Sequence, residues 1–139
     1  MRIMAIDCGD AHTGIAISDP TGFLAGFTTV INAYRPEAVA EQISALAKEH
    51  GVEELVLGHP INMDGTRGPR SEKAQAMKVL LEEATSLPVV LWDERRTTID
   101  AHQILMNSGK NAKKRKKVVD AVAATLILEG YLTYKKSHP

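Results

Sequence analysis

A change in hydrophobic period near residue 34 constrains the fold of this chain more than any other feature. Before that point, apolar residues cluster or alternate in three short segments, at residues 2–9, 12–19 and 23–31. The short connections between these segments predict a meander of antiparallel strands. After that point, helical and strand patterns alternate, which is typical of α/β proteins whose sheet also contains parallel strands.

Two helices and two buried strands are expected in this second part, in the order helix, strand, helix, strand, at residues 35–51, 54–60, 70–86 and 89–94. Pro36 suits the first turn of the first helix, and Gly51 is the residue at which that helix should end. The inward stripe of this helix is predicted to contain Val39, Ile43, Leu46 and Ala47. The inward stripe of the second helix is predicted to contain Ala74, Met77, Leu80, Leu81 and Ala84.

Two further helices should complete the chain. Residues 97–100, "TTID", have the spacing of a capping box and predict the start of a third helix. The last helix should end near Tyr134 and pack on the sheet through Val119, Val122, Leu126 and their neighbours. We therefore predict one α/β domain spanning residues 1–139, built on a mixed sheet with right-handed crossovers.

The composition is that of an intracellular protein. No apolar stretch is long enough to span a bilayer, and the N-terminus reaches an acid at Asp7, so neither a signal peptide nor a transit peptide is expected. The single cysteine, Cys8, excludes an internal disulfide and fits a reducing cytosol. We expect a cytoplasmic protein with no membrane partner.

Charge is unevenly distributed along the chain, although the net charge is zero. Residues 1–60 contain 3 Lys and Arg against 8 Asp and Glu, whereas residues 61–139 contain 14 against 9. This asymmetry fits a basic surface that binds a polyanion. It fits a solvated surface of mixed charge equally well.

Asp120 is the least expected residue of the last predicted helix. From Val118 to Leu128 every residue except Asp120 and Thr125 is apolar, so the helix is hydrophobic nearly all round. A carboxylate buried there would cost several kcal/mol unless it had a partner. That partner could be an arginine or a backbone donor, or it could be a metal ion.

Asp7 and Glu94 are two further acids at the ends of predicted strands. Asp7 ends the first strand, where the alternative role is a turn residue that caps its own backbone. Glu94 ends the last strand and could instead form an exposed ion pair with Arg95 or Arg96. Asp93 competes with Glu94, because strand alternation would direct the two side chains to opposite faces.

Together the three acids suggest a metal site, provided that the fold brings them to one edge of the sheet. Carboxylate clusters bind Mg²⁺ or Mn²⁺, which prefer oxygen ligands. Two such ions can activate water and stabilise a leaving oxygen during phosphodiester cleavage. A zinc site is not expected, since the five His and one Cys show no ligand spacing.

A dense basic run lies just before Asp120, at Lys110, Lys113, Lys114, Arg115, Lys116 and Lys117. These side chains could contact phosphates and give salt-dependent affinity. The alternative is a solvated helix start, although cations there oppose the helix dipole. Neither a Walker A loop nor a G-x-S-x-G element is present.

Four motifs occur in an order that resembles the YqgF/RuvX family across essentially the whole chain. They are "AIDCGDAHTGIAISD", "LGHPINMDGTRGP", "DERRTT" and "KKVVDAVAATLILEGYL". This family comprises small bacterial proteins assigned as pre-16S rRNA nucleases and related to RuvC-type Holliday junction resolvases. The resemblance implies a ribonuclease H-like fold with a five-stranded mixed sheet of order 3-2-1-4-5, in which strand 2 is antiparallel to the others and helices flank the sheet.

The resemblance also implies the roles of individual residues. Asp7, Glu94 and Asp120 would be the catalytic residues and the ligands of the divalent metals. The family's substrate-facing loop would correspond to Gly58, Pro60, Met63, Asp64, Gly65, Thr66 and Gly68. His59 and Glu129 depart from the usual residues, which are apolar and glutamine respectively. In the implied strand order, the backbones of Asp7 and Glu94 would lie roughly 10 Å apart, a span that two metals could bridge.

The function expected from these features is metal-dependent trimming of the 5′ end of precursor 16S rRNA during ribosome assembly. Structured RNA and the pre-ribosomal particle would be partners of a monomer or weak homodimer. The phosphate-binding residues would be Arg67, Arg70, Arg95, Arg96 and the basic run. Alternatives are a Holliday junction resolvase acting on branched DNA, and a non-catalytic nucleic-acid-binding or transcription-associated factor. An actin- or hexokinase-like phosphotransferase ranks last, because it needs two such domains.

Overall fold

The structure of the protein is a computed structural model that describes residues 1–9, 11–21, 25–59, 68–93 and 112–137. Along the chain the elements are β1 (Ile3–Cys8), β2 (His12–Ser18), β3 (Ala25–Asn32), α1 (Pro36–His50), β4 (Glu54–His59), α2 (Pro69–Thr85), β5 (Val89–Asp93) and α4 (Ala112–Ser137). The helix predicted from residue 97 lies outside the described residues.

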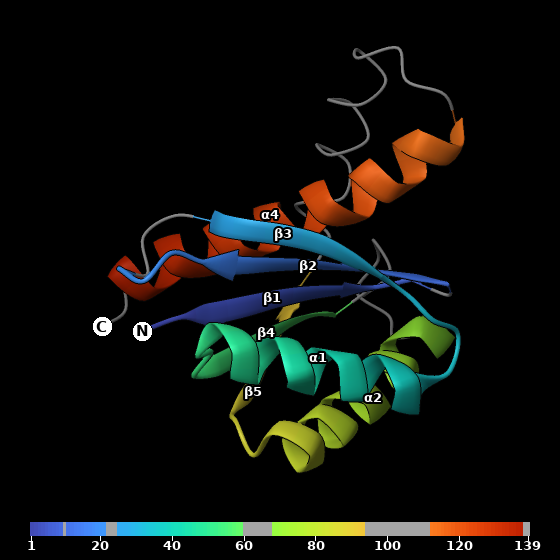
Figure 1. Cartoon of the computed structure of the whole chain (residues 1–139), viewed down its shortest axis with the longest axis horizontal. Coiled ribbons are helices and arrows are strands. Elements are labelled where there is room, and N and C mark those ends of the chain that lie inside the picture. The colour runs from blue at the N-terminus through green and yellow to red at the C-terminus, as the bar shows by residue number, and fades with distance from the viewer. Residues whose placement is uncertain (10, 22–24, 60–67, 94–111, 138–139) are drawn as a thin grey trace.

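The five strands form one mixed sheet with the order β3-β2-β1-β4-β5 (Figure 1). β2 is antiparallel to both β1 and β3, whereas β4 is parallel to both β1 and β5. The predicted order and the predicted orientation of the second strand are therefore confirmed. β1 is the central strand. Because only β2 runs in the opposite direction, the carboxyl ends of β1, β3, β4 and β5 all lie at one edge of the sheet, which we call the carboxyl edge.

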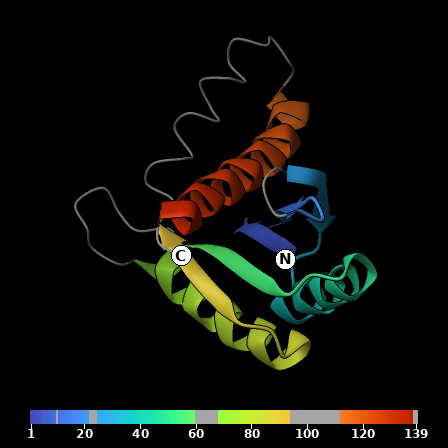
Figure 2. The same cartoon turned by 90° about the vertical axis from the view of Figure 1, so that its left-hand side faces the viewer.

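Helices cover both faces of the sheet: α1 and α2 pack on one face and α4 on the other (Figure 2). Strand alternation divides the strand residues between the two faces. Met4 and Ile6 of β1 point toward α1 and α2, and Ile3 and Ala5 point toward α4. We call these the α1/α2 face and the α4 face.

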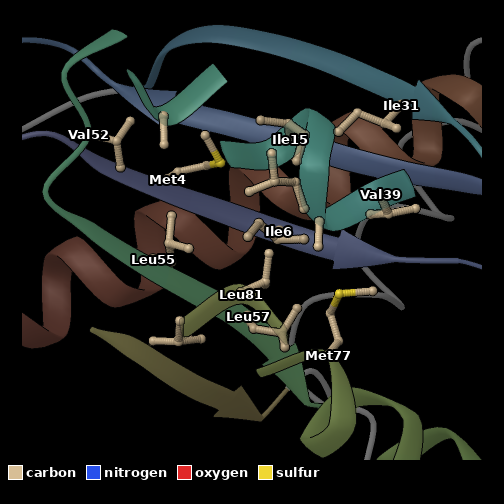
Figure 3. Packing of buried hydrophobic residues seen from close by; sticks show 14 of the residues in the cluster. Met4, Ile6, Ile15, Ile31, Val39, Val52, Leu55, Leu57, Met77 and Leu81 are labelled. Atoms are coloured by element: carbon tan, nitrogen blue, oxygen red, sulfur yellow. The ribbon is translucent and has the colours of Figure 1, made fainter. Parts of the chain in front are cut away.

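The core on the α1/α2 face is the larger of the two and contains most of the branched side chains (Figure 3). The predicted inward stripe of α1 is confirmed: Val39, Ile43 and Ala47 are buried in this core, and Leu46 is half-buried. In α2 the prediction holds through Leu81 but is wrong for Ala84, which is exposed. The buried stripe ends one turn early, because α2 ends at Thr85 and the chain turns back at Ser86 to enter β5.

The face of α4 that packs on the sheet differs from the one predicted. Val122 and Leu126 are only half-buried. The buried stripe consists of Ala123, Ala124, Ile127, Leu128, Tyr131 and Leu132. Apolar residues surround nearly the whole helix, so periodicity alone could not select the face that contacts the sheet. Among the described helices, none is long and apolar enough to cross a membrane.

Candidate functional site

Asp7 is an acid that follows the buried apolar residues of β1, one residue before the strand ends. Its place in the strand alternation, after Ile3 and Ala5, puts it on the α4 face. The side chain is half-buried. Within the described part of the chain it forms neither a hydrogen bond nor an ion pair, so the alternative role as a turn cap gains no support there.

Two glycines flank Asp7 across the sheet. Gly14 of β2 is paired directly with Asp7. On the other side, Ile6 is paired with Leu57, so the next residues along the two parallel strands are Asp7 and Gly58. Beyond Gly58 the row continues to Trp92 of β5. Neither directly paired position therefore contributes a side chain beside the Asp7 carboxylate.

Gly9 holds the turn between β1 and β2 in place at this edge. Its N–H donates to the carbonyl oxygen of His12 at 2.9 Å. A Cβ atom added to Gly9 would lie 2.5 Å from that same oxygen, closer than a Cβ atom can approach backbone. The glycine of the D-x-G motif is thus required by the close approach of two backbone segments.

Replacing Gly9 by alanine should force this turn open and destabilise the protein by about 1 to 3 kcal/mol, the usual cost of inserting a methyl group where there is no room. The midpoint of urea unfolding should fall at an unchanged m-value. Cleavage activity should fall as well, since the turn positions the end of β1. An unchanged urea midpoint would contradict this account of Gly9.

Asp120 reaches the carboxyl edge because α4 runs opposite to β1 (Figure 1). The Tyr131 hydroxyl donates to Glu54, which is paired with Ile3 at the beginning of β1. From Tyr131 back to Asp120 the helix rises about 16 Å, and from Ile3 to Asp7 the strand rises about 13 Å. The backbone of Asp120 is therefore at the level of the end of β1, on the α4 face and one turn before the buried Ala124.

The contact between Tyr131 and Glu54 fixes the opposite half of α4. Burial and the Glu54 carboxylate beside it raise the pKa of the Tyr131 hydroxyl well above its ordinary value. Tyr131 therefore stays neutral and keeps its proton for the bond to Glu54. Lys135 adds an ion pair to Glu54 at 3.4 Å. This anchor sets the position of α4 along the sheet, and with it the position of Asp120.

Glu94 lies outside the described residues, directly after the last residue of β5. Val90 and Trp92 of that strand pack with the α4-face cluster, whereas Asp93 follows the alternation of Leu91 on the α1/α2 face. Asp93 is therefore directed away from the face that carries Asp7. β4 separates β5 from β1 in the strand order.

The predicted phosphate-binding residues divide into two groups. Arg67, Arg95, Arg96 and Lys110 lie outside the described residues, as do all but Gly58 and Gly68 of the proposed loop residues. Arg70 is the second residue of α2, the helix that follows the carboxyl end of β4 along the chain. The first turns of α4, which lead to Asp120, contain Lys113, Lys114, Arg115, Lys116 and Lys117. The first turns of α4 thus lie at the same end of the sheet as the end of β1 (Figure 1).

The two departures from the family pattern lie apart from Asp7. His59 is buried on the α1/α2 face, where its Nε2 atom lies 2.6 Å from the Ser71 hydroxyl of α2. Glu129 is exposed on α4. His59 therefore belongs to the contact between β4 and α2, and it does not share the sheet face of Asp7.

The donor set fits a hard divalent cation better than a soft one. Asp7 offers carboxylate oxygens, and oxygen is the ligand that Mg²⁺ and Mn²⁺ prefer. Within the described ranges no three His, Cys, Asp or Glu side chains are grouped so that they could hold a metal ion.

Comparison with known proteins gives concordant results. The RuvX family, described as Holliday junction resolvase, matches residues 1–134. A protein of Halothermothrix orenii named "Putative pre-16S rRNA nuclease" is 44% identical over 135 residues, covering 97% of this chain and 96% of the relative. A protein of the same name from Clostridium botulinum strain Alaska E43 is 46% identical over 132 residues, covering 95% and 96%.

Solved structures agree with the fold. Thermus thermophilus RuvC in complex with a Holliday junction superposes with a TM-score of 0.65 at 14% identity, covering 99% of this chain and 96% of that one. Fowlpox virus resolvase, bound to a Holliday junction, gives a TM-score of 0.56 at 10% identity, covering 99% of both chains. At such low identity these likenesses establish a RuvC-like, ribonuclease H-type fold. From the match over residues 1–134 and the close relatives, this chain belongs to the RuvX family.

Proposed function

We propose that the chain is a metal-dependent nuclease that trims the 5′ end of precursor 16S rRNA in the cytoplasm. The observation that carries this proposal is the position of Asp7. It lies at the carboxyl edge of the central strand, between two glycines and on the sheet face along which α4 brings Asp120 to the same level. The names of the relatives support the RNA substrate.

In this proposal Asp7, Glu94 and Asp120 hold two Mg²⁺ or Mn²⁺ ions. When bound, the metal lowers the pKa of a water molecule and neutralises charge that develops on the scissile phosphate. The chain's own contribution is to position the carboxylates that hold the metal. β1 presents Asp7 from the rigid centre of the sheet, and the buried stripe of α4 sets the depth of Asp120.

The basic residues supply binding in this proposal. The run from Lys113 to Lys117, together with Lys110, would face the phosphates of structured RNA at the carboxyl edge. Arg67, Arg70, Arg95 and Arg96 would add contacts from the neighbouring loops and the start of α2. Neutralising phosphates in this way gives affinity that falls with salt. The enzyme would act on the pre-ribosomal particle as a monomer or weak homodimer.

A Holliday junction resolvase is the second candidate, favoured by the description of the family and by the likeness to RuvC. The deciding experiment presents purified protein and Mg²⁺ or Mn²⁺ with a labelled rRNA leader and with a four-way DNA junction. Cleavage of the leader without cleavage of the junction supports the rRNA nuclease. Symmetric cutting of the junction alone would replace that proposal with a resolvase. Binding of both without cutting would favour a non-catalytic factor.

A further inference from the structure

His12 is the first residue of β2 and shares the sheet face of Asp7. Ala16, on the same side of β2, belongs to the α4-face cluster, and alternation places Gly14 and His12 on that side too. Because Gly14 is paired with Asp7, His12 is the diagonal cross-strand neighbour of Asp7, toward the carboxyl edge. Diagonal neighbours are about 7 Å apart, a gap that a bound water or a phosphate oxygen can fill.

Asn32 fixes the orientation and the tautomer of this histidine. The two residues are paired across β2 and β3, and Nδ1 of His12 lies 2.6 Å from Oδ1 of Asn32. A carbonyl oxygen can only accept, so Nδ1 carries the proton and donates it. In the neutral ring, Nε2 then holds a lone pair and is a proton acceptor. Among the described residues Nε2 has no hydrogen-bond partner.

This arrangement resembles the way in which general bases are prepared: one ring nitrogen is held by a fixed acceptor while the other faces the reaction. The third partner is Asn32 rather than a carboxylate, which orients the ring without adding a negative charge. A purely structural reading is that the His12–Asn32 pair only ties the start of β2 to the end of β3. That reading leaves unexplained why the ring occupies the diagonal position nearer the carboxyl edge, on the sheet face of Asp7.

We propose that His12 is a catalytic residue that accepts the proton of the attacking water. Water gives one proton to Nε2, and its oxygen forms the new bond to phosphorus. The bond between phosphorus and the leaving ribose oxygen breaks, and that oxygen takes a proton from solvent water. The imidazolium then returns its proton to solvent. This role rests on the proposed nuclease function.

The test combines kinetics with chemical rescue. We expect His12→Ala to lower kcat on the rRNA leader by about 100-fold, the scale of general-base catalysis, with KM changed less than about threefold. The Mn²⁺ concentration that gives half-maximal rate should not change. Added imidazole should restore at least a tenth of the wild-type rate to His12→Ala, because it can replace the missing base. His12→Gln should fold normally but respond more weakly to imidazole, since glutamine fills part of the space.

His50→Gln is the matched control. His50 ends α1 at the opposite edge of the sheet, where its ring packs against Phe27, and its removal should leave kcat unchanged. Asn32→Leu should retain some activity but less than wild type, because it frees the ring without removing it.

Three outcomes would overturn the proposal while leaving the nuclease function intact. They are wild-type kcat in His12→Ala, lost activity that imidazole fails to restore, and a raised Mn²⁺ requirement, which would make His12 a metal ligand. Failure of the nuclease function itself would look different. In that case the wild type would cut neither the rRNA leader nor the junction, and Asp7→Asn would be indistinguishable from it.

Discussion

Replacing Asp7 by asparagine should reduce cleavage on the order of 10³-fold, equivalent to about 4 kcal/mol of transition-state stabilisation. Asparagine has nearly the same shape but lacks the negative charge and one of the two oxygen ligands. The flanking Gly14 and Gly58 offer no side chain that could substitute for the lost oxygen. Single-turnover rates on the labelled rRNA leader at saturating Mn²⁺ would measure the effect.

The same substitution should leave the protein as stable as the wild type or slightly more stable. Asp7 is half-buried and has no ion-pair partner among the described residues, so its charge is not a source of folding stability there. Glu53→Gln is a suitable control. Glu53 is an exposed acid just before β4, at the opposite edge of the sheet, and its removal should not affect cleavage. An Asp7→Asn protein that keeps more than a tenth of the wild-type rate would exclude Asp7 from the metal site.

Replacing Ile127 by alanine should destabilise the protein by about 2 to 5 kcal/mol. Ile127 is fully buried on α4 and packs in the same cluster as Ala5, Ala16 and Val56. Two of these three neighbours are alanines, which cannot extend to fill the cavity. The free energy of unfolding, measured in urea, should show the loss directly.

The effect of Ile127→Ala should extend to activity, because the sheet contacts of α4 set the position of Asp120. At a temperature where the variant is still folded, we expect slower cleavage and a higher Mn²⁺ requirement. Val79→Ala on α2 is the matched control: Val79 is 53% exposed, and its truncation should change stability by no more than about 0.5 kcal/mol. Equal stability of the two variants would show that this part of α4 is not held by the contacts described.

Much of the fold could be predicted from the sequence because its signals are local. The stripe of Val39, Ile43 and Ala47 and the stop at Gly51 depend on residues within a few turns. The strand order could not be obtained in this way, since pairing β1 with β4 joins residues about fifty positions apart. That part of the prediction came from resemblance to the YqgF/RuvX family.

Errors in the prediction arose where one sequence pattern allowed two placements. The apolar spacing predicts that Val122 and Leu126 of α4 face the sheet, yet Ala123 and Ala124 are the buried residues. Small residues let the helix approach the sheet closely, and hydrophobicity scales rank them below valine and leucine. Ala84 was predicted to be buried from spacing alone, which carries no information on where the neighbouring strand begins.

The candidate site, like the fold, could be predicted from the sequence only in part. Asp7 was evident as an acid at the end of a buried strand, and Asp120 as an acid in an apolar helix. The two flanking glycines and the diagonal position of His12 depend on cross-strand register, which the sequence does not display. The face taken by Asp93 could be assigned only from the packing of Leu91 and Trp92 on opposite faces of β5.

The central claim is that acids from β1 and α4 hold metal together at the carboxyl edge. The most direct test is the number of Mn²⁺ ions bound by the wild type and by Asp120→Asn, each mixed with a non-cleavable rRNA-leader oligonucleotide. We predict about two ions per chain for the wild type, as in two-metal phosphodiester cleavage, and at least one fewer for the folded variant. Equal stoichiometry and equal affinity in the two proteins would contradict the claim and remove Asp120 from the site.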